Sequence, residues 1–126
     1  MPITIALQPN QRVIFITIAS PVTGLELSKI YAQVEELKNQ SPFLLHCLVD
    51  TTKVRGVPSD LFLARTSVRW DLAAQTHNVI VVKNAGFRIL ADTFFRFARF
   101  DKATIVQTLK EGQEFLDRAI QEEVYG

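Results

Sequence analysis

Residues 43–49, FLLHCLV, form an almost unbroken apolar run of strand length, and Asp50 follows them directly. Such a run is typical of a strand that is covered on both faces, as the strands of a parallel sheet are. Residues 79–82, VIVV, have the same aliphatic character and lie between Asn78 and Asn84. We therefore expect these two segments to lie side by side as inner strands of one sheet.

The first forty residues carry the signals of a hairpin and a helix. Residues 3–7 and 13–18 are apolar and β-branched, and a Pro-Asn-Gln turn sequence separates them, which predicts two antiparallel strands. Thr23 and Glu26 have the spacing of a capping box, and apolar residues then recur at helical intervals. The spacing predicts a helix over residues 25–40.

The second half of the chain repeats the alternation of helix and strand. Helical patterns cover residues 58–74 and 86–98, and a short strand is expected at 103–107. Thr108 and Glu111 form a second capping box, which predicts a closing helix. The full order is ββαβαβαβα, which favours the α/β class: a mixed, mainly parallel sheet of four to five strands with helices packed on it.

The bulk composition is that of one globular domain spanning residues 1–126, with 48% hydrophobic and 21% charged residues. Fourteen Lys and Arg against thirteen Asp and Glu give a net charge of +1, so no global field favours nucleic acid or anionic lipid. A single cysteine, Cys47, allows no internal disulfide, and no segment has the composition of a leader or a membrane span. We expect a cytoplasmic protein.

The element order and residues 48–54, LVDTTKV, resemble the STAS domain (sulfate transporter and anti-sigma factor antagonist). The resemblance is strongest to the small SpoIIAA-like bacterial relatives, and it covers nearly the whole chain. It implies a regulatory module that binds a partner protein. In that family, a strand ending in Asp is followed about eight residues later by an Asp-Ser-Ser-Gly turn, whose second serine is phosphorylated in the antagonists.

The family's turn matches this sequence at one position only. Counted from Asp50 without a gap, the turn falls on residues 58–61, where Ser59 matches and Asp60 takes the place of the phosphorylated serine. A carboxylate there resembles at most a permanent negative charge, because a serine kinase cannot modify it. A shift of one position would instead place Ser59 on the phosphorylated site. Ser59 has a simpler interpretation as a helix N-cap.

Asp50 ends an apolar strand, at the place where α/β folds commonly carry functional residues. The structural alternative is that Asp50 caps the following turn by accepting backbone amides, with Thr51 and Thr52 serving the same turn. If a ligand site exists, we expect the loop 50–59 and the turn 84–86 to line it, because both follow the carboxyl ends of strands.

No catalytic or metal-binding motif stands out in the sequence. His46 and Cys47 are neighbours on a strand, so their side chains point to opposite faces and cannot chelate one ion or form a nucleophilic pair. We expect His46 to be a hydrogen-bonded core or edge histidine and His77 to be solvated at a turn. No metal and no cofactor are therefore predicted. An enzyme that uses Asp50 with His46 is the least favoured of our hypotheses.

The predicted helix at 86–98, with the residues just after it, is rich in aromatic and basic side chains: Phe87, Phe94, Phe95, Phe97 and Phe100, with Arg88, Arg96 and Arg99 between them. At helical spacing Phe94 faces the sheet and Phe95 does not, which leaves aromatic surface beside arginine. Arg65, Arg69 and Trp70 on the preceding predicted helix extend this patch, whose composition is typical of protein interfaces. Alternatively, the segment is a wide core stripe covered by arginine stems.

Three functions remain open at this point. We prefer a non-catalytic regulatory module that docks a protein partner, or a second copy of itself, through the second and third helices. The first alternative is a carrier of a small apolar or anionic, lipid-like ligand held between the sheet and the Phe-rich helix. The second alternative is an enzyme that uses Asp50 with His46. A nucleic-acid partner is not expected, because the aromatic residues lie on helices rather than on an open sheet.

Overall fold

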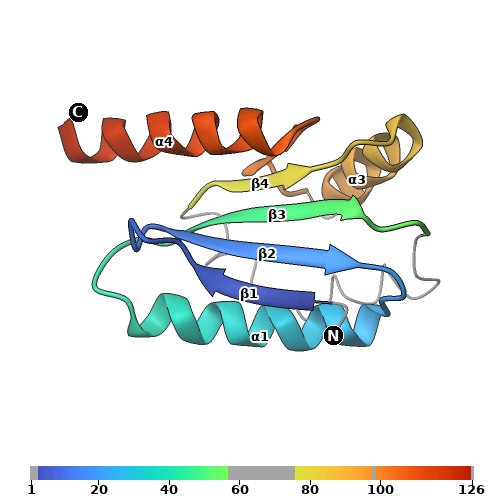
Figure 1. Cartoon of the computed structure of the whole chain (residues 1–126), viewed down its shortest axis with the longest axis horizontal. Helices are drawn as coiled ribbons and strands as arrows, with labels where there is room; N and C mark the ends of the chain where they lie inside the picture. The colour runs from blue at the N-terminus through green and yellow to red at the C-terminus, as the bar shows by residue number, and fades with distance from the viewer. Residues whose placement is uncertain (1–2, 57–75, 98, 126) are drawn as a thin grey trace.

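The computed structural model describes residues 3–56, 76–97 and 99–125 (Figure 1). In chain order the elements are β1 (Ile3–Leu7), β2 (Val13–Ala19), α1 (Gly24–Gln40), β3 (His46–Lys53), β4 (Asn78–Val81), α3 (Ala85–Phe97), β5 (Ala103–Val106) and α4 (Leu109–Tyr125). Within these ranges the strands form one five-stranded sheet with the order β1-β2-β3-β4-β5. Strands β1 and β2 are antiparallel and the other neighbours are parallel, so the expected mixed α/β fold is confirmed.

The two aliphatic runs lie side by side at the centre of the sheet, as expected. Strand β3 pairs in parallel with β4, and Val49 is aligned with Ile80. The start of β3 differs from the prediction, because pairing begins at His46, whose amide donates to the carbonyl of Arg12. Phe43 and Leu44 precede the strand and are 41% and 51% exposed. The apolar run therefore marks the strand but not its first paired residue.

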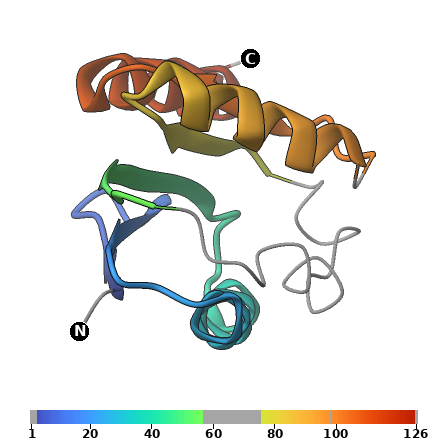
Figure 2. The same ribbon diagram turned by 90° about the vertical axis from the view of Figure 1, so that its right-hand side faces the viewer.

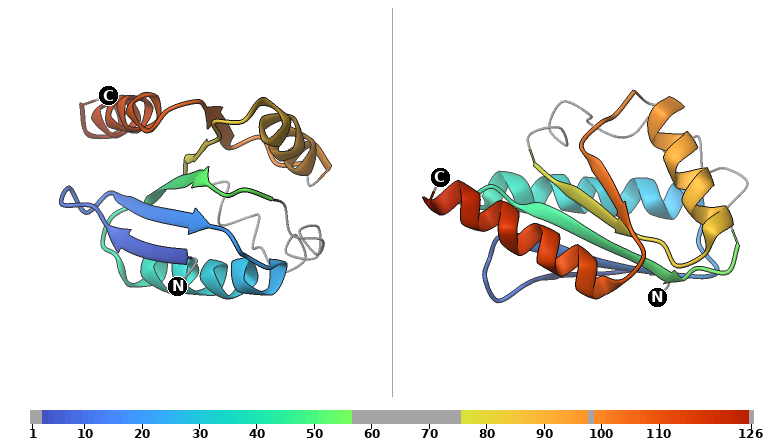
Figure 3. Two further views of the ribbon diagram at one scale, coloured as in Figure 1. Left: turned by 45° about the vertical axis from the view of Figure 1, so that its right-hand side comes forward. Right: turned by 90° about the horizontal axis from the view of Figure 1, so that it is seen from above.

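The helices cover the two faces of the sheet unequally. Helix α4 lies over one face, and α1 and α3 lie over the other (Figures 2 and 3). Because side chains alternate along a strand, Leu48 packs toward Leu116 of α4, whereas Cys47 packs toward Val34 of α1. Gly112 permits the close approach of α4, since a Cβ atom there would lie 2.9 Å from Cδ1 of Leu48.

Both predicted N-cap residues start a helix in the structure, and the complete capping box is formed at α1. At α1 the hydroxyl of Thr23 accepts from the Glu26 amide at 3.1 Å, and the Glu26 carboxylate accepts from the Thr23 amide at 3.1 Å. At α4 the amide of Glu111 donates to the hydroxyl of Thr108 at 3.1 Å. These bonds satisfy amides that have no partner within the first turn of a helix.

Part of the expected architecture lies outside the described residues. The predicted helix at 58–74 falls there, together with five candidate site residues: Ser59, Asp60, Arg65, Arg69 and Trp70. In the portions of the chain that the structure describes, no helix combines the length and the apolar character that a bilayer span requires.

Candidate functional site

Two adjoining cavities lie between the sheet, α1 and α3. Their volumes are about 220 Å³ and about 200 Å³. The two cavities share five lining residues from β2, α1, β4 and α3: Ile18, Leu27, Ile80, Phe94 and Phe95. Because the cavities share these walls, we treat them as one feature and call it the apolar trough.

The strand pattern supplies the floor of the apolar trough. Ile16 and Ile18 of β2, Val49 of β3 and Ile80 of β4 all line it, because alternate side chains of parallel neighbours project from the same face. On the other face of these strands, the residues between them pack beneath α4. The apolar runs that define the inner strands therefore also provide the apolar floor.

The Phe-rich helix provides one wall of the apolar trough. Phe94 and Phe95 meet edge to face with ring centroids 5.4 Å apart, and Phe95 also lies 5.9 Å from the ring of Phe100. The structure differs here from the helical-wheel expectation, because Phe95 is half-buried in this wall. Helix α3 packs near the edge strand β5. Side chains on the flank of the helix, such as Phe95, therefore border the trough together with those that face the strands directly.

The polar groups at the trough are neutral. Burial raises the pKa of the Tyr31 phenol well above its ordinary value, with smaller contributions from Cys47 and Glu35. Burial likewise raises the pKa of the Cys47 thiol. Among the described residues that line the apolar trough, none carries a charge at neutral pH. The trough therefore suits an uncharged, apolar group.

A third cavity of about 470 Å³ adjoins the apolar trough at the carboxyl ends of β3 and β4. Its lining comes from the end of β3, the residues after β3 and β4, and the first turn of α3: Thr51, Thr52, Val54, Arg55, Lys83, Asn84 and Phe87. We call it the basic hollow. The described part of the loop after Asp50, which ends at residue 56, thus lies beside the turn at Asn84. These are the two segments that the strand topology predicted would line a ligand site.

Asp50 lies within β3, which continues to Lys53, and its carboxylate bonds to Thr52 near the end of the strand. The side chain is 6% exposed, and its Oδ1 atom accepts from the Thr52 amide at 2.9 Å and from the Thr52 hydroxyl at 2.7 Å. The hydroxyl of Thr51 donates to the carbonyl of Val81 at 2.6 Å and ties the end of β3 to β4. This geometry agrees with the structural interpretation of Asp50, in which its carboxylate accepts hydrogen bonds from the residues that follow it.

Asp50 and His46 do not meet in one site. Both point to the face that α4 covers, but four residues along a strand separate them by about 13 Å. His46 is 1% exposed, and neither side chain lines the apolar trough or the basic hollow.

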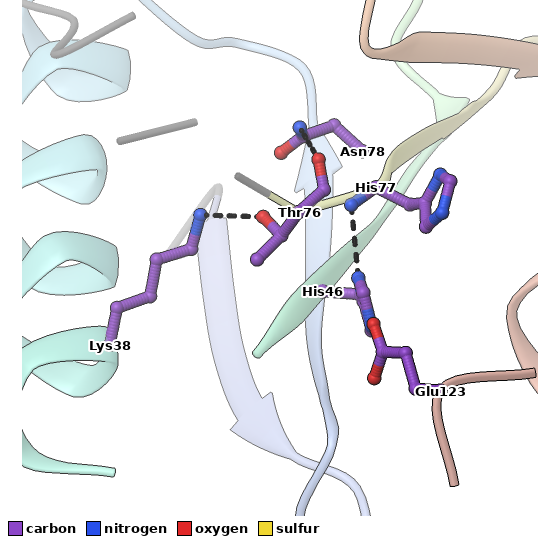
Figure 4. A network of polar contacts seen from close by, with 6 residues as sticks. All are labelled: Lys38, His46, Thr76, His77, Asn78 and Glu123. Atoms are coloured by element: carbon purple, nitrogen blue, oxygen red, sulfur yellow. Dashed lines mark hydrogen bonds and ion pairs between the residues drawn. The ribbon is translucent and has the colours of Figure 1, made fainter. Parts of the chain in front are cut away.

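His46 belongs to a polar network that joins four parts of the fold (Figure 4). Its Nδ1 atom accepts from the His77 amide at 2.9 Å, so the ring proton resides on Nε2, which lies 2.7 Å from Oε1 of Glu123. The alignment at Glu123 falls short of a well-formed hydrogen bond, although the separation has the right length. Burial lowers the pKa of His46, and the Glu123 carboxylate opposes this effect.

His77 is more enclosed than a solvated turn residue, which corrects the expectation from sequence. Its ring lies 5.3 Å from the His46 ring and meets Phe115 of α4 edge to face at 5.4 Å. Next to it, the hydroxyl of Thr76 accepts from Lys38 of α1 at 3.1 Å. The network therefore links α1, β3, the start of β4 and α4.

The outer face of α3 and the turn after it carry the remaining candidate residues. Arg88 and Arg99 are exposed, and Arg96 pairs with Asp92 at 3.0 Å while its side chain stays 81% exposed. Ile89 lies among them and is 69% exposed. Phe95, which the sequence grouped with these arginines as one partner-binding patch, is half-buried and lines the apolar trough, whereas the three arginines are exposed.

Comparison with known proteins adds no family assignment. No family model matches the sequence, and no curated protein matches it either. The fold and the cavities define the chain as a small α/β protein with a five-stranded mixed sheet and an apolar trough on one face. Its function has to be argued from that site.

Proposed function

We propose that this chain is a non-catalytic binding module that resembles STAS domains and binds a small apolar ligand in the apolar trough. The observation that carries the proposal is the lining of the trough, in which Phe94, Phe95 and Ile80 face a common space with no charged neighbour among the described residues. Ligand sites in proteins have this composition, with few polar groups and aromatic walls.

Size supports the proposal. Ligand pockets commonly measure about 300–1,000 Å³, and the two adjoining cavities, of about 220 and 200 Å³, together reach the lower part of this range. Each methylene group buried contributes about 0.8 kcal/mol, which is roughly a fourfold gain in affinity. Because association itself costs several kcal/mol, only ligands with several methylenes should bind measurably.

The experiment uses a series of straight-chain alcohols from hexanol to decanol, with binding measured by calorimetry. The proposal predicts that affinity rises roughly fourfold per methylene until the trough is full. Ala91→Phe places a ring in the trough and should weaken octanol binding at least tenfold, because Ala91 lines the cavity. Ile89→Phe adds the same ring on the exposed outer face of α3 and should leave binding unchanged. Absence of binding across the series, or equal effects of the two variants, would overturn the proposal.

A second candidate function is docking of a second copy of the chain on the outer face of α3. The observation that favours it is the exposure of Ile89 between Arg88 and Asp92. A face that carries both charge signs around an apolar centre is self-complementary, as a two-fold interface requires. Sedimentation should then show a concentration-dependent dimer that Ile89→Asp abolishes while the fold is retained. A native chain that stays monomeric at all concentrations tested would remove this candidate.

A further inference from the structure

The basic hollow opens from the apolar trough and differs from it in charge. The two share Thr51, Val54 and Phe87, so one ligand can extend from one into the other. Arg55 and Lys83 line the hollow, and no carboxylate belongs to the part of its lining that the structure describes. The apolar trough thus adjoins a hollow that is lined by two positive charges.

The two cations have defined backbone positions. Arg55 follows β3, and its amide donates to the hydroxyl of Ser20 at 2.8 Å. Lys83 follows β4, where the amide of Val82 donates to the carbonyl of Val106 at 2.9 Å. The sheet therefore fixes the backbone near both side chains, so the site needs no rearrangement of the strands to present them.

The start of α3 adds to the positive potential of the basic hollow. The Oδ1 atom of Asn84 accepts from the amides of Gly86 and Phe87 at 2.8 and 3.2 Å, so these amides are already capped. The helix dipole still favours an anion near its amino end. The nearby Asp50 carboxylate is buried and bonded to Thr52, and it does not line the hollow.

From this charge complementarity we propose that the ligand is a single-chain amphiphile with an anionic head, a carboxylate or a phosphate, at Arg55 and Lys83, and with its alkyl chain in the apolar trough. The inference rests on the proposed function and specifies the ligand class. Exposed ion pairs are individually weak and are screened by salt. The head group should therefore contribute about a tenfold gain over a neutral head at low salt, and most of this gain should disappear at about 0.5 M salt.

The test compares octanoate, octyl phosphate, octanol and octylamine on the native chain by calorimetry at low and high salt. We expect the two anions to bind about tenfold more tightly than octanol at low salt, and octylamine to bind more weakly than octanol. The ratio of octanoate to octyl phosphate identifies which anionic head fits better. In the double variant Arg55→Glu with Lys83→Glu, octanol affinity should be unchanged and octanoate should bind more weakly than octanol.

Lys110→Glu is the matched control, because Lys110 is an exposed cation on α4, over the opposite face of the sheet. It should leave the preference for octanoate unchanged. Equal binding of octanol, octanoate and octylamine at low salt would overturn this inference while leaving the apolar trough as the binding site. Failure of all four compounds to bind would overturn the proposed function as well.

Discussion

The Nε2 atom of His46 lies 2.7 Å from Oε1 of Glu123, which connects the first residue of β3 to the last turns of α4. The other ring nitrogen accepts from the His77 amide, so protonation of His46 would break that hydrogen bond. The fold thus holds a buried histidine in its neutral form. A positive charge on this ring is disfavoured by burial and by the nearby Lys38 and His77, and among the described residues it is favoured by Glu123.

The lowered pKa of His46 predicts a loss of stability in mild acid. The unfolded chain binds a proton at His46 near pH 6.5, whereas the folded chain resists it, so the free energy of unfolding should fall as the pH drops from about 7 to 5. The slope should approach but not exceed about 1.4 kcal/mol per pH unit, the limit for one proton. Urea unfolding at several pH values measures this.

Two histidine variants show which histidine causes the pH dependence of the free energy of unfolding. His46→Gln should flatten the slope between pH 7 and 5, because the group whose pKa differs between folded and unfolded chain is gone. His77→Gln should retain most of the slope. A native chain with equal stability at pH 7 and pH 5 would show that His46 titrates normally.

Removal of the carboxylate from Glu123 should destabilise the fold. Glu123→Ala removes the carboxylate oxygen that lies 2.7 Å from the buried Nε2 of His46. Because the alignment of this contact is imperfect, the expected cost is about 1 kcal/mol. Glu122→Ala removes an exposed carboxylate from the neighbouring position and should change stability by less than about 0.5 kcal/mol. If both variants unfold at the same urea concentration, the contact with His46 contributes nothing.

Leu116 anchors α4 to the sheet and should be among the costliest positions to truncate. The side chain is 0% exposed and packs with Leu48 and Val79. Leu116→Ala should therefore lower the free energy of unfolding by about 2–5 kcal/mol. Leu109→Ala, at a position 39% exposed on the same helix, is the control and should cost far less. Similar midpoints for the two variants would contradict this packing.

Asp50 should behave as a structural residue. Asp50→Asn keeps an oxygen that can accept from the Thr52 amide and hydroxyl, so stability should change little. Asp50→Ala leaves both donors without that acceptor and should cost about 1–3 kcal/mol. Octanol affinity of the folded variants should equal that of the native chain. A loss of binding in a stable Asp50→Asn variant would instead give this carboxylate a functional role.

Local signals were sufficient for most of the elements. The paired aliphatic runs predicted β3 and β4, and the spacing of Thr23 and Glu26 predicted the start of α1, because these patterns depend on neighbouring residues only. The first paired residue of β3 was not predictable. It depends on where Arg12 of the preceding hairpin offers a carbonyl to His46.

The site was less accessible to sequence reasoning. The contact between His46 and Glu123 joins distant segments, and the only available signal was that a histidine inside an apolar run needs a polar partner. The position of Phe95 depends on where α3 lies relative to the sheet edge, which helical periodicity does not specify. Topology did predict that the loop after Asp50 and the turn at Asn84 would approach each other.

The most direct test of the apolar trough as a ligand site is a measurement of magnetisation transfer between bound octanol and the protein by nuclear magnetic resonance. Our account predicts transfer from the alkyl protons of octanol to the rings of Phe94 and Phe95 and to the methyl groups of Ile80. Transfer only to residues beneath α4, such as Leu116, or to no protein proton at all, would contradict it.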